Sequence, residues 1–238
     1  MGAPELSVVI PVYNEVESLP LLVPAVVDTM EKIGRPYEVL LIDDGSRDGS
    51  FAKMVELKAA CTHLRCIKFR KNCGQTAAMW AGFREARGGI VITIDADLQN
   101  DPADIPKLLA KMPEHDAVVG WRAKRNDPAW RLIQSRIANW IRNKLSGEQI
   151  ADTGCSLKAY KRECVQKLKL YKGLHRFLPT LIKMEGYKVT EVVVSHRPRE
   201  HGESKYGIGN RAIPALKDLL AVRWMKKRHI RYEIEEEK

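Results

Sequence analysis

The chain has 238 residues, 45% of them hydrophobic and 29% charged, which fits one globular domain with a core, or one domain followed by a tail. Forty Lys and Arg against thirty Asp and Glu give a formal net charge of +10, which indicates anionic partners such as nucleotides or a membrane surface. Only this charge favours nucleic acid, because the sequence has no zinc-finger, homeodomain or RNP-like motif, so we expect no nucleic-acid partner.

Cysteine content and hydropathy indicate the cellular compartment and argue against a membrane-spanning protein. The five Cys residues form no CxxC pair, which argues against a disulfide framework or a zinc site and favours a reducing compartment. No apolar stretch reaches the roughly 18 to 20 residues of a membrane-spanning helix. We therefore expect a cytoplasmic protein, soluble or peripheral on the cytoplasmic face of a membrane.

Strand and helix patterns alternate through the first half of the chain. Short apolar runs predict strands at 6–11, 37–42, 64–69 and 90–94. Helical patterns follow them, ending near 33 and then covering 49–60, 77–86 and 103–111. This alternation predicts an α/β fold, a mostly parallel sheet with helices on both faces, in which ligands bind beyond the carboxyl ends of the strands.

Polar clusters follow three of these strands, at 13–15, 43–46 and 95–99. Helix capping alone would explain one cluster, whereas three at the same rim favour a nucleotide pocket. In the third cluster, Asp95 and Asp97 are two residues apart and can converge on one Mg²⁺ or Mn²⁺ that keeps positions open for phosphate oxygens. The alternative is a solvated loop that caps the helix starting near Pro102.

The second half of the chain carries candidate phosphate ligands. Arg122 follows a predicted strand at 116–120, where an arginine can clamp phosphate in a bidentate way. A helical pattern at 130–145 puts Arg131 and Ser135 four residues apart, so they project together and can hold an incoming phosphate. The apolar stripe of that helix is expected to pack on the domain.

Further along, Asp152 starts a turn, a helix is predicted at 170–183, and a strand at 189–194. We expect Arg176 and Phe177 to line the cleft of the incoming phosphate and His175 to lie on the surface. The string RxxGxSK at 199–205 is rich in donors and flexible at its glycine, as a loop that closes over phosphates should be. A basic loop without a ligand is the alternative.

The predicted catalytic domain covers residues 1–210, and 211–238 form an amphipathic, charged tail without a transmembrane helix. Apolar residues at 213–224 run into a basic cluster at 226–229. The tail is either an interfacial helix at lipid head groups or a helix docked on the catalytic domain, and the pattern does not separate the two.

Three motifs occur in order: VIPVYNE at 9–15, DDGSRDGS at 43–50 and DADLQ at 95–99. Together they resemble the family 2 glycosyltransferases with the GT-A fold, and most of all the dolichol-phosphate mannose synthase and polyprenyl-phosphate glycosyltransferase branch. The resemblance covers roughly residues 5 to 212.

The resemblance implies a role for each candidate. The nucleoside is held by Pro11, Tyr13, Glu15 and Asp44, with Asp43, Gln75 and Ala96 in the same pocket. The metal is held by Asp95, Asp97 and Gln99, and the diphosphate is also contacted by Arg122, Arg199, Ser204 and Lys205. The acceptor phosphate is received by Arg131 and Ser135, and Asp152 is the candidate base.

The resulting hypothesis is an inverting, metal-dependent transfer of a hexose, mannose or glucose, from a GDP- or UDP-sugar to a polyprenyl phosphate, with contact to a membrane surface. A phosphate monoester is already an anion at pH 7, since its second pKa is about 6, so Asp152 could instead only orient Arg131 or the acceptor. Two alternatives stay open: a sugar hydroxyl acceptor, for which Asp152 would be indispensable, and a binding module for nucleotide sugars or anionic lipids without turnover.

Overall fold

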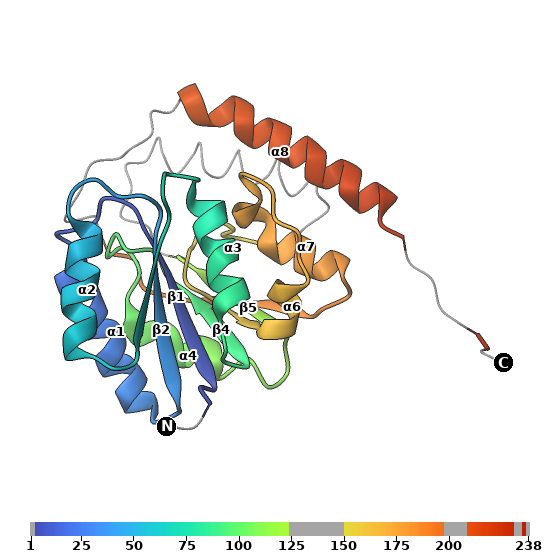
Figure 1. The fold of residues 1–238 in the computed structure, drawn as a ribbon. Helices are drawn as coiled ribbons and strands as arrows, with labels where there is room; N and C mark the ends of the chain where they lie inside the picture. The colour runs from blue at the N-terminus through green and yellow to red at the C-terminus, as the bar shows by residue number, and fades with distance from the viewer. Residues whose placement is uncertain (1–2, 124–149, 198–208, 231–234, 237–238) are drawn as a thin grey trace.

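The computed structural model describes residues 3–123, 150–197, 209–230 and 235–236 (Figure 1). The predicted helix at 130–145, with Arg131 and Ser135, lies outside the described residues. The same holds for the string at 199–205, with Arg199, Ser204 and Lys205.

One seven-stranded sheet forms the centre of the molecule, in the order β3-β2-β1-β4-β6-β5-β7. Its strands are β1 (Leu6–Val12), β2 (Tyr37–Asp43), β3 (Leu64–Lys68), β4 (Ile90–Thr93), β5 (Ala117–Trp121), β6 (Lys158–Lys161) and β7 (Val189–Val193). The first four are parallel to their neighbours in that group, β5 is parallel to β7, and β6 is antiparallel to both β4 and β5. The mostly parallel sheet predicted from the sequence is confirmed.

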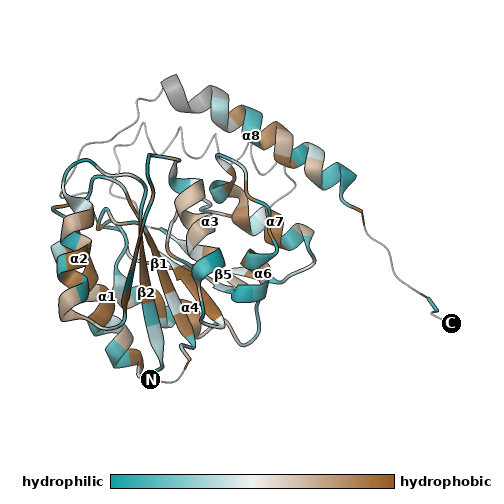
Figure 2. Ribbon diagram, viewed as in Figure 1, coloured by the Kyte–Doolittle hydropathy of each residue, from teal (hydrophilic) through white to brown (hydrophobic). Residues whose placement is uncertain are grey.

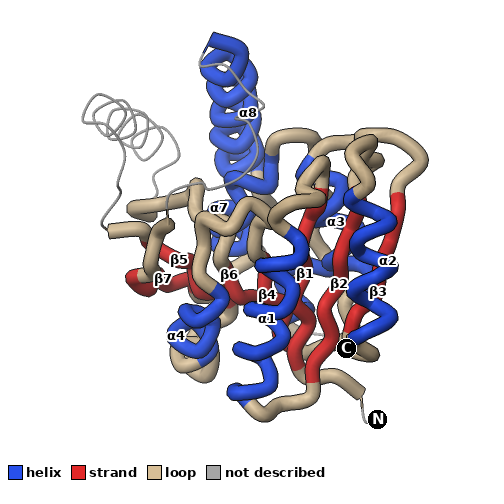
Figure 3. The backbone as a smooth tube through the Cα atoms, turned by 90° about the vertical axis from the view of Figure 1, so that its left-hand side faces the viewer, coloured by secondary structure: helices blue, strands red, loops and turns tan. Residues whose placement is uncertain are grey.

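Helices cover both faces of the sheet (Figures 1 and 3). One face carries α1 (Leu19–Ile33), α2 (Ser50–Ala60), the 3₁₀ turn η1 (Pro102–Asp104) and α4 (Ile105–Leu109). The other carries α3 (Gln75–Glu85), α6 (Arg162–Gln166), the 3₁₀ turn η2 (Leu174–Phe177), α7 (Leu178–Met184) and α8 (Gly209–Arg228).

Side chains of the central strands alternate between the two hydrophobic layers. Val8 and Ile10 belong to the core under α1, whereas Val9 belongs to the core under α3. This is the period-2 alternation of a strand buried on both sides, and it explains why β1 reads as a continuous apolar run. Figure 2 shows the same apolar colouring along the central strands and the inner sides of the helices.

Two elements differ from the sequence prediction. The segment at 158–161 is an antiparallel strand, β6, which the sequence pattern did not indicate because the segment is short and begins and ends with lysine. The predicted helix at 170–183 does not start at 170. Gly173 has a φ of 90°, which interrupts the pattern, and the α-helical part begins at Leu178, with Pro179 in its first turn.

Helix α8 lies across the top of α3 and α7 in Figure 1. Leu219 and Val222 are buried in the hydrophobic layer of that side, so α8 is docked on the domain. Leu216, Leu220 and Trp224 remain 50%, 50% and 63% exposed, so an apolar stripe is left uncovered on this helix. No helix among the described residues is both long enough and apolar enough to cross a membrane.

Candidate active site

The ends of β1 and β2 are joined by the turn that follows β2. The Asp44 N–H donates to the Val12 carbonyl at 2.8 Å. The Asp44 carboxylate accepts hydrogen bonds from the backbone N–H groups of Cys73 at 2.6 Å and Gly74 at 2.8 Å, and from the Asn72 amide at 2.9 Å. Burial is the main cause that raises the pKa of Asp44, against these hydrogen bonds. Asp44 therefore ties the loop before α3 to the end of β2.

Gly45 makes this close approach possible. Its φ is 73°, and a Cβ there would lie 2.5 Å from the backbone carbonyl carbon of Lys71. Any side chain would push the loop before α3 away from the end of β2.

The neighbouring Asp43 is fully buried, and only one of its two carboxylate oxygens accepts a hydrogen bond from another described residue. Its Oδ1 accepts from the Ser46 N–H at 3.1 Å, whereas its Oδ2 has no hydrogen-bond partner among the described residues. A buried carboxylate oxygen without a partner is costly unless a ligand supplies a donor. Of the two carboxylates at the end of β2, Asp43 is thus the one whose Oδ2 accepts no hydrogen bond from the residues that the structure describes.

A cavity of about 570 Å³ opens beyond the end of β4. Its lining comes from the β4 end, the β5 end, the segment before β6, the start of α3 and η2: Gln75, Met79, Asp95, Asp97, Gln99, Arg122, Thr153, Gly154, Cys155, Ser156, Lys158, His175 and Arg176. The three predicted metal ligands, Gln75 and Arg122 therefore share one cavity.

Five other predicted residues do not line this cavity: Pro11, Tyr13, Glu15, Asp43 and Asp44. They lie at the ends of β1 and β2, the strands on the far side of β4 from β6. Ala96 is 3% exposed and its side chain packs in the core.

Asp95 and Asp97 form a negatively charged pair at the cavity wall. Burial, and then the charge of Asp97, raise the pKa of Asp95 to about 6. Gln75 Nε2 donates to Asp95 Oδ1 at 2.8 Å, and the Gln99 N–H donates to Asp97 Oδ1 at 3.2 Å. A divalent cation would relieve the repulsion between these two carboxylates, and oxygen ligands suit Mg²⁺ or Mn²⁺.

Asp95, Asp97 and Gln99 could hold such an ion if phosphate oxygens complete its coordination sphere. Among the described residues no group of three His, Cys, Asp or Glu side chains could enclose a metal. Two carboxylates and the amide oxygen of Gln99 leave coordination positions for water and for substrate phosphates, as Mg²⁺ sites with phosphate ligands commonly do.

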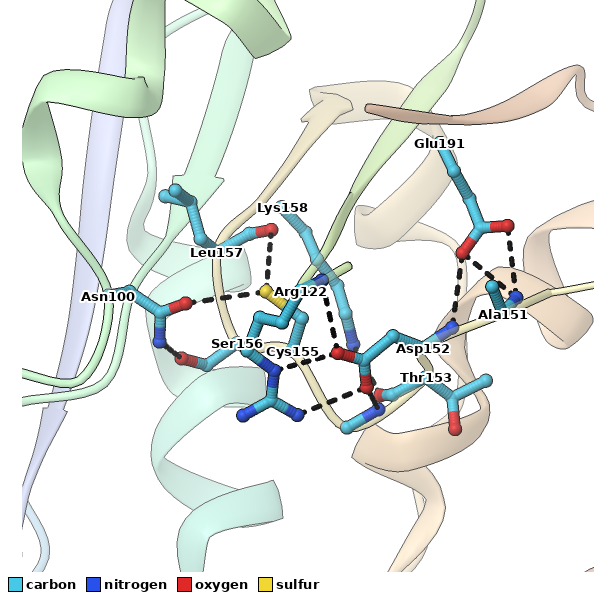
Figure 4. A network of polar contacts seen from close by, with 11 residues as sticks. Asn100, Arg122, Ala151, Asp152, Thr153, Cys155, Ser156, Leu157, Lys158 and Glu191 are labelled. Atoms are coloured by element: carbon cyan, nitrogen blue, oxygen red, sulfur yellow. Dashed lines mark hydrogen bonds and ion pairs between the residues drawn. The ribbon is translucent and has the colours of Figure 1, made fainter. Parts of the chain in front are cut away.

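Arg122, which follows β5 and lines the cavity, forms a bidentate ion pair with Asp152 (Figure 4). Arg122 Nε and Nη2 donate to Asp152 Oδ2 and Oδ1 at 2.7 and 3.0 Å, and the two side chains are only 11% and 6% exposed. Burial alone would lower the pKa of Arg122, but the hydrogen bond and charge of Asp152 raise it. Both oxygens of the Asp152 carboxylate thus accept from Arg122 and fix the orientation of its guanidinium. Nη1 makes neither of these two hydrogen bonds.

The cavity wall also contains two residues that the sequence reasoning did not place there. Lys158, on β6, is 3% exposed and donates from Nζ to the Thr153 carbonyl at 3.3 Å. The expectation that His175 lies on the surface is wrong. It lines the cavity, and its Nδ1 lies 2.7 Å from the Thr76 hydroxyl. Burial, together with the charges of Arg176 and Lys158, lowers the pKa of His175 to about 3, so the ring is neutral at pH 7.

Arg176 lines this cavity, whereas Phe177 does not, because its side chain is 5% exposed and packs in the core. No local signal could have found Lys158 and His175, because a lysine in a buried strand and a histidine beside Gly173 are defined only by the packing of β6 and η2.

Comparison with known proteins identifies the family of this chain. The family model of glycosyl transferase family 2 matches residues 7–169, more than half of the chain. The chain belongs to this family. The match includes the three motifs, Arg122, Asp152 and β6.

Two curated relatives are similar over most of the chain. A dodecaprenyl-phosphate galacturonate synthase from Rhizobium johnstonii is 40% identical over 226 residues, covering 92% of this chain and 66% of the relative. An undecaprenyl-phosphate 4-deoxy-4-formamido-L-arabinose transferase from Salmonella paratyphi B is 41% identical over 218 residues, covering 91% and 66%. The chain thus spans about two thirds of the length of these relatives.

Among solved structures, glucosyl-3-phosphoglycerate synthase from Mycobacterium tuberculosis, crystallised with Mn²⁺, UDP and phosphoglyceric acid, matches with a TM-score of 0.66. The two share 18% identity, and the match covers 96% of this chain and 80% of that chain. At this identity the likeness concerns the fold, and it confirms the predicted GT-A architecture.

Proposed function

We propose that this protein transfers a sugar from a nucleoside diphosphate sugar to a polyprenyl phosphate with inversion at the anomeric carbon. The observation that carries the proposal is one cavity lined both by the carboxylate pair that follows β4 and by Arg122, which Asp152 orients at the end of β5. The first suits a metal-bound diphosphate and the second suits an incoming phosphate. The two curated relatives are named for sugar transfer to prenyl phosphates, which supports the same acceptor class.

In the proposed reaction, an oxygen of the acceptor phosphate forms a bond to the anomeric carbon while the bond to the diphosphate oxygen breaks. The nucleoside diphosphate leaves. Asp95, Asp97 and Gln99 would hold Mg²⁺ or Mn²⁺, which when bound supplies charge neutralisation of the leaving diphosphate. The family resemblance implied that Arg122 contacts the diphosphate; because Asp152 fixes its guanidinium, we assign it to the acceptor phosphate instead. The chain thus contributes positioning and electrostatics.

Asp152 acts on Arg122 in this scheme and removes no proton. The acceptor is already an anion at pH 7 and needs no base, and both Asp152 oxygens already accept from Arg122. A sugar hydroxyl acceptor would require a base. The Asp152 carboxylate is already paired with Arg122, which argues against that alternative.

Residues outside the described part of the chain keep their predicted roles. Arg131 and Ser135 would receive the acceptor phosphate, and Arg199, Ser204 and Lys205 would close over the diphosphate. Asp43, whose Oδ2 has no hydrogen-bond partner among the described residues, is our candidate among the strand-end acids to accept a hydrogen bond from the base or ribose.

The exposed side chains of α8 are suited to contact with a membrane surface. Leu216, Leu220 and Trp224 are spaced by four residues, so they share one side of the helix, and the last turn is basic. We propose that this side rests on an anionic membrane surface, which would bring the lipid acceptor to the cavity and make the protein peripheral on the cytoplasmic face. Sedimentation with phosphatidylglycerol vesicles should fall for Trp224→Glu, and unchanged sedimentation would contradict this contact.

The function is tested by measuring sugar transfer to a short polyprenyl phosphate in the presence of Mn²⁺. A panel of UDP- and GDP-linked sugars, with mannose and glucose among them, covers the open choice of base and sugar. Sugar should move to the lipid only when lipid phosphate is present. Tight nucleotide-sugar binding with no transfer from any donor would instead support a binding module.

A further inference from the structure

One wall of the cavity carries positive charge that the proposed reaction does not yet use. Lys158 on β6 and Arg176 on η2 both line the cavity, with the neutral ring of His175 beside them. The Lys158 ammonium is almost completely buried, yet its only hydrogen bond with another described residue goes to the Thr153 carbonyl, at 3.3 Å. An ammonium group has three donors, so two of them are available to a ligand.

The other charges of the cavity are balanced without these two cations. Arg122 is paired with Asp152, and Asp95 with Asp97 would be neutralised by the divalent ion. Neither Lys158 nor Arg176 forms an ion pair with another residue that the structure describes. Lys158 is influenced by the charges of Asp152 and Asp95. Burial raises the pKa of Asp218 of α8, and Arg176 lies near enough for its charge to act in the opposite direction and lower it. A buried lysine in this position is costly unless a ligand brings a negative group.

The order of the strands indicates which part of the donor reaches this wall. The residues predicted to hold the nucleoside lie at the ends of β1 and β2, the carboxylates proposed to hold the metal follow β4, and β6 is the next strand in the sheet. A nucleoside diphosphate sugar that spans the metal site therefore directs its sugar away from β2, toward β6 and η2. Lys158 is paired in register with Thr93, below Asp95, so it lies at the floor of this end of the cavity.

We propose that Lys158 and Arg176 bind a carboxylate on the donor sugar, so that the preferred donor is a nucleoside diphosphate hexuronate and not a neutral hexose. A lysine and an arginine converging on one carboxylate form charge-assisted hydrogen bonds, which are stronger than those to a neutral hydroxymethyl group. His175, fixed by Thr76, is placed to contact a neighbouring hydroxyl. This inference rests on the proposed function for the identity of the cavity as the donor site.

Binding of matched donors tests the inference without the need for turnover. Displacement of a fluorescent nucleotide is measured with UDP-galacturonate against UDP-galactose, UDP-glucuronate against UDP-glucose, and GDP-mannuronate against GDP-mannose, each with Mn²⁺. In the wild type, the acidic donor of at least one pair should bind about tenfold to one hundredfold more tightly than its neutral partner. Lys158→Met and Arg176→Gln should each lose most of this preference, while affinity for the nucleoside diphosphate alone stays the same.

The matched control is Lys172→Met, an exposed lysine in the segment just before η2 that does not line the cavity. It should keep the preference. Arg176 is only half-buried, so Arg176→Gln remains informative if Lys158→Met fails to fold.

Each other outcome decides the question. An absence of preference for acidic donors in all pairs overturns the inference, as does a preference that survives both substitutions. An equal loss of affinity for the nucleoside diphosphate alone would assign the two cations to the diphosphate and also overturn it. If acidic donors bind selectively but no sugar reaches the lipid, the inference stands and the proposed function fails.

Discussion

Replacing Asp152 by Asn separates an orienting role from a catalytic base. The substitution keeps the shape of the side chain but removes the charge from an ion pair that is 11% and 6% exposed. Removing one partner of a buried pair costs about 3–5 kcal/mol, and the remaining amide oxygen can still accept one of the two hydrogen bonds. We therefore expect Asp152→Asn to lower the free energy of unfolding by about 2–3 kcal/mol. For a chain of this length, that corresponds to a melting temperature roughly 5 to 10 °C lower.

The decisive assay is a double-mutant cycle with Arg122→Gln, measured both as urea unfolding and as sugar transfer to polyprenyl phosphate. If Asp152 works only through Arg122, then Asp152→Asn should cost almost nothing further once Arg122 is replaced. If Asp152 removes a proton, it should still cost about a hundredfold or more in rate in the Arg122→Gln background. Additive losses in both assays would refute the orienting role.

The control for the stability arm is an exposed Arg–Glu pair. Arg35 and Glu5 are 40% and 52% exposed, and their Nε to Oε2 distance is 2.8 Å. Glu5→Gln should change stability very little, because exposed pairs are weakened by solvent. A loss as large as that of Asp152→Asn would mean that burial is not what makes the Arg122 pair strong.

Two further predictions concern stability. The pKa of Asp116 is lowered, first of all by the hydrogen bond from Lys161, so this carboxylate stabilises the fold above the ordinary carboxyl range and loses that contribution as the pH falls through its folded pKa. Asp116→Asn should therefore lower the unfolding free energy at pH 7 by roughly 1 kcal/mol, whereas an equal difference at pH 3 would contradict the linkage. Gly45→Ala and Gly34→Ala both force a side chain into left-handed backbone, but only at Gly45 does the new Cβ meet backbone, 2.5 Å away. Urea unfolding should show a loss of about 1 kcal/mol for Gly34→Ala and a clearly larger loss for Gly45→Ala, and equal losses would disprove the close approach.

The sequence predicted those parts of the fold in which the hydrophobic pattern of a segment matches its burial in the folded protein. Strands β1, β2 and β4 are apolar runs that end in polar residues, and Asp95 and Asp97 lie at the expected rim. The antiparallel strand β6 could not be predicted, because Lys158 is hydrophilic by pattern and buried only through its place between β4 and β5.

The contacts within the site were also beyond the sequence. Asp152 and Arg122 are thirty residues apart, and only the approach of the segment before β6 to the end of β5 pairs them. Likewise, the sequence could not show that the Asp44 carboxylate accepts hydrogen bonds from the loop before α3, or that Asp43 Oδ2 has no partner within the described part of the chain. Which carboxylate is hydrogen-bonded within the protein depends on where the fold places backbone N–H groups, and the sequence does not show this.

The most direct test of the proposed function is transfer of labelled sugar into the organic phase by wild type and by Asp97→Ala, with Mn²⁺ or with EDTA. The matched control is Asp28→Ala, which removes an exposed carboxylate on α1 that is paired with Lys32. We expect EDTA to abolish transfer, Asp97→Ala to lower it by about a hundredfold or more, and Asp28→Ala to leave it unchanged. Transfer at the wild-type rate by Asp97→Ala, or transfer that resists EDTA, would contradict the proposal that this carboxylate pair holds a metal-bound diphosphate.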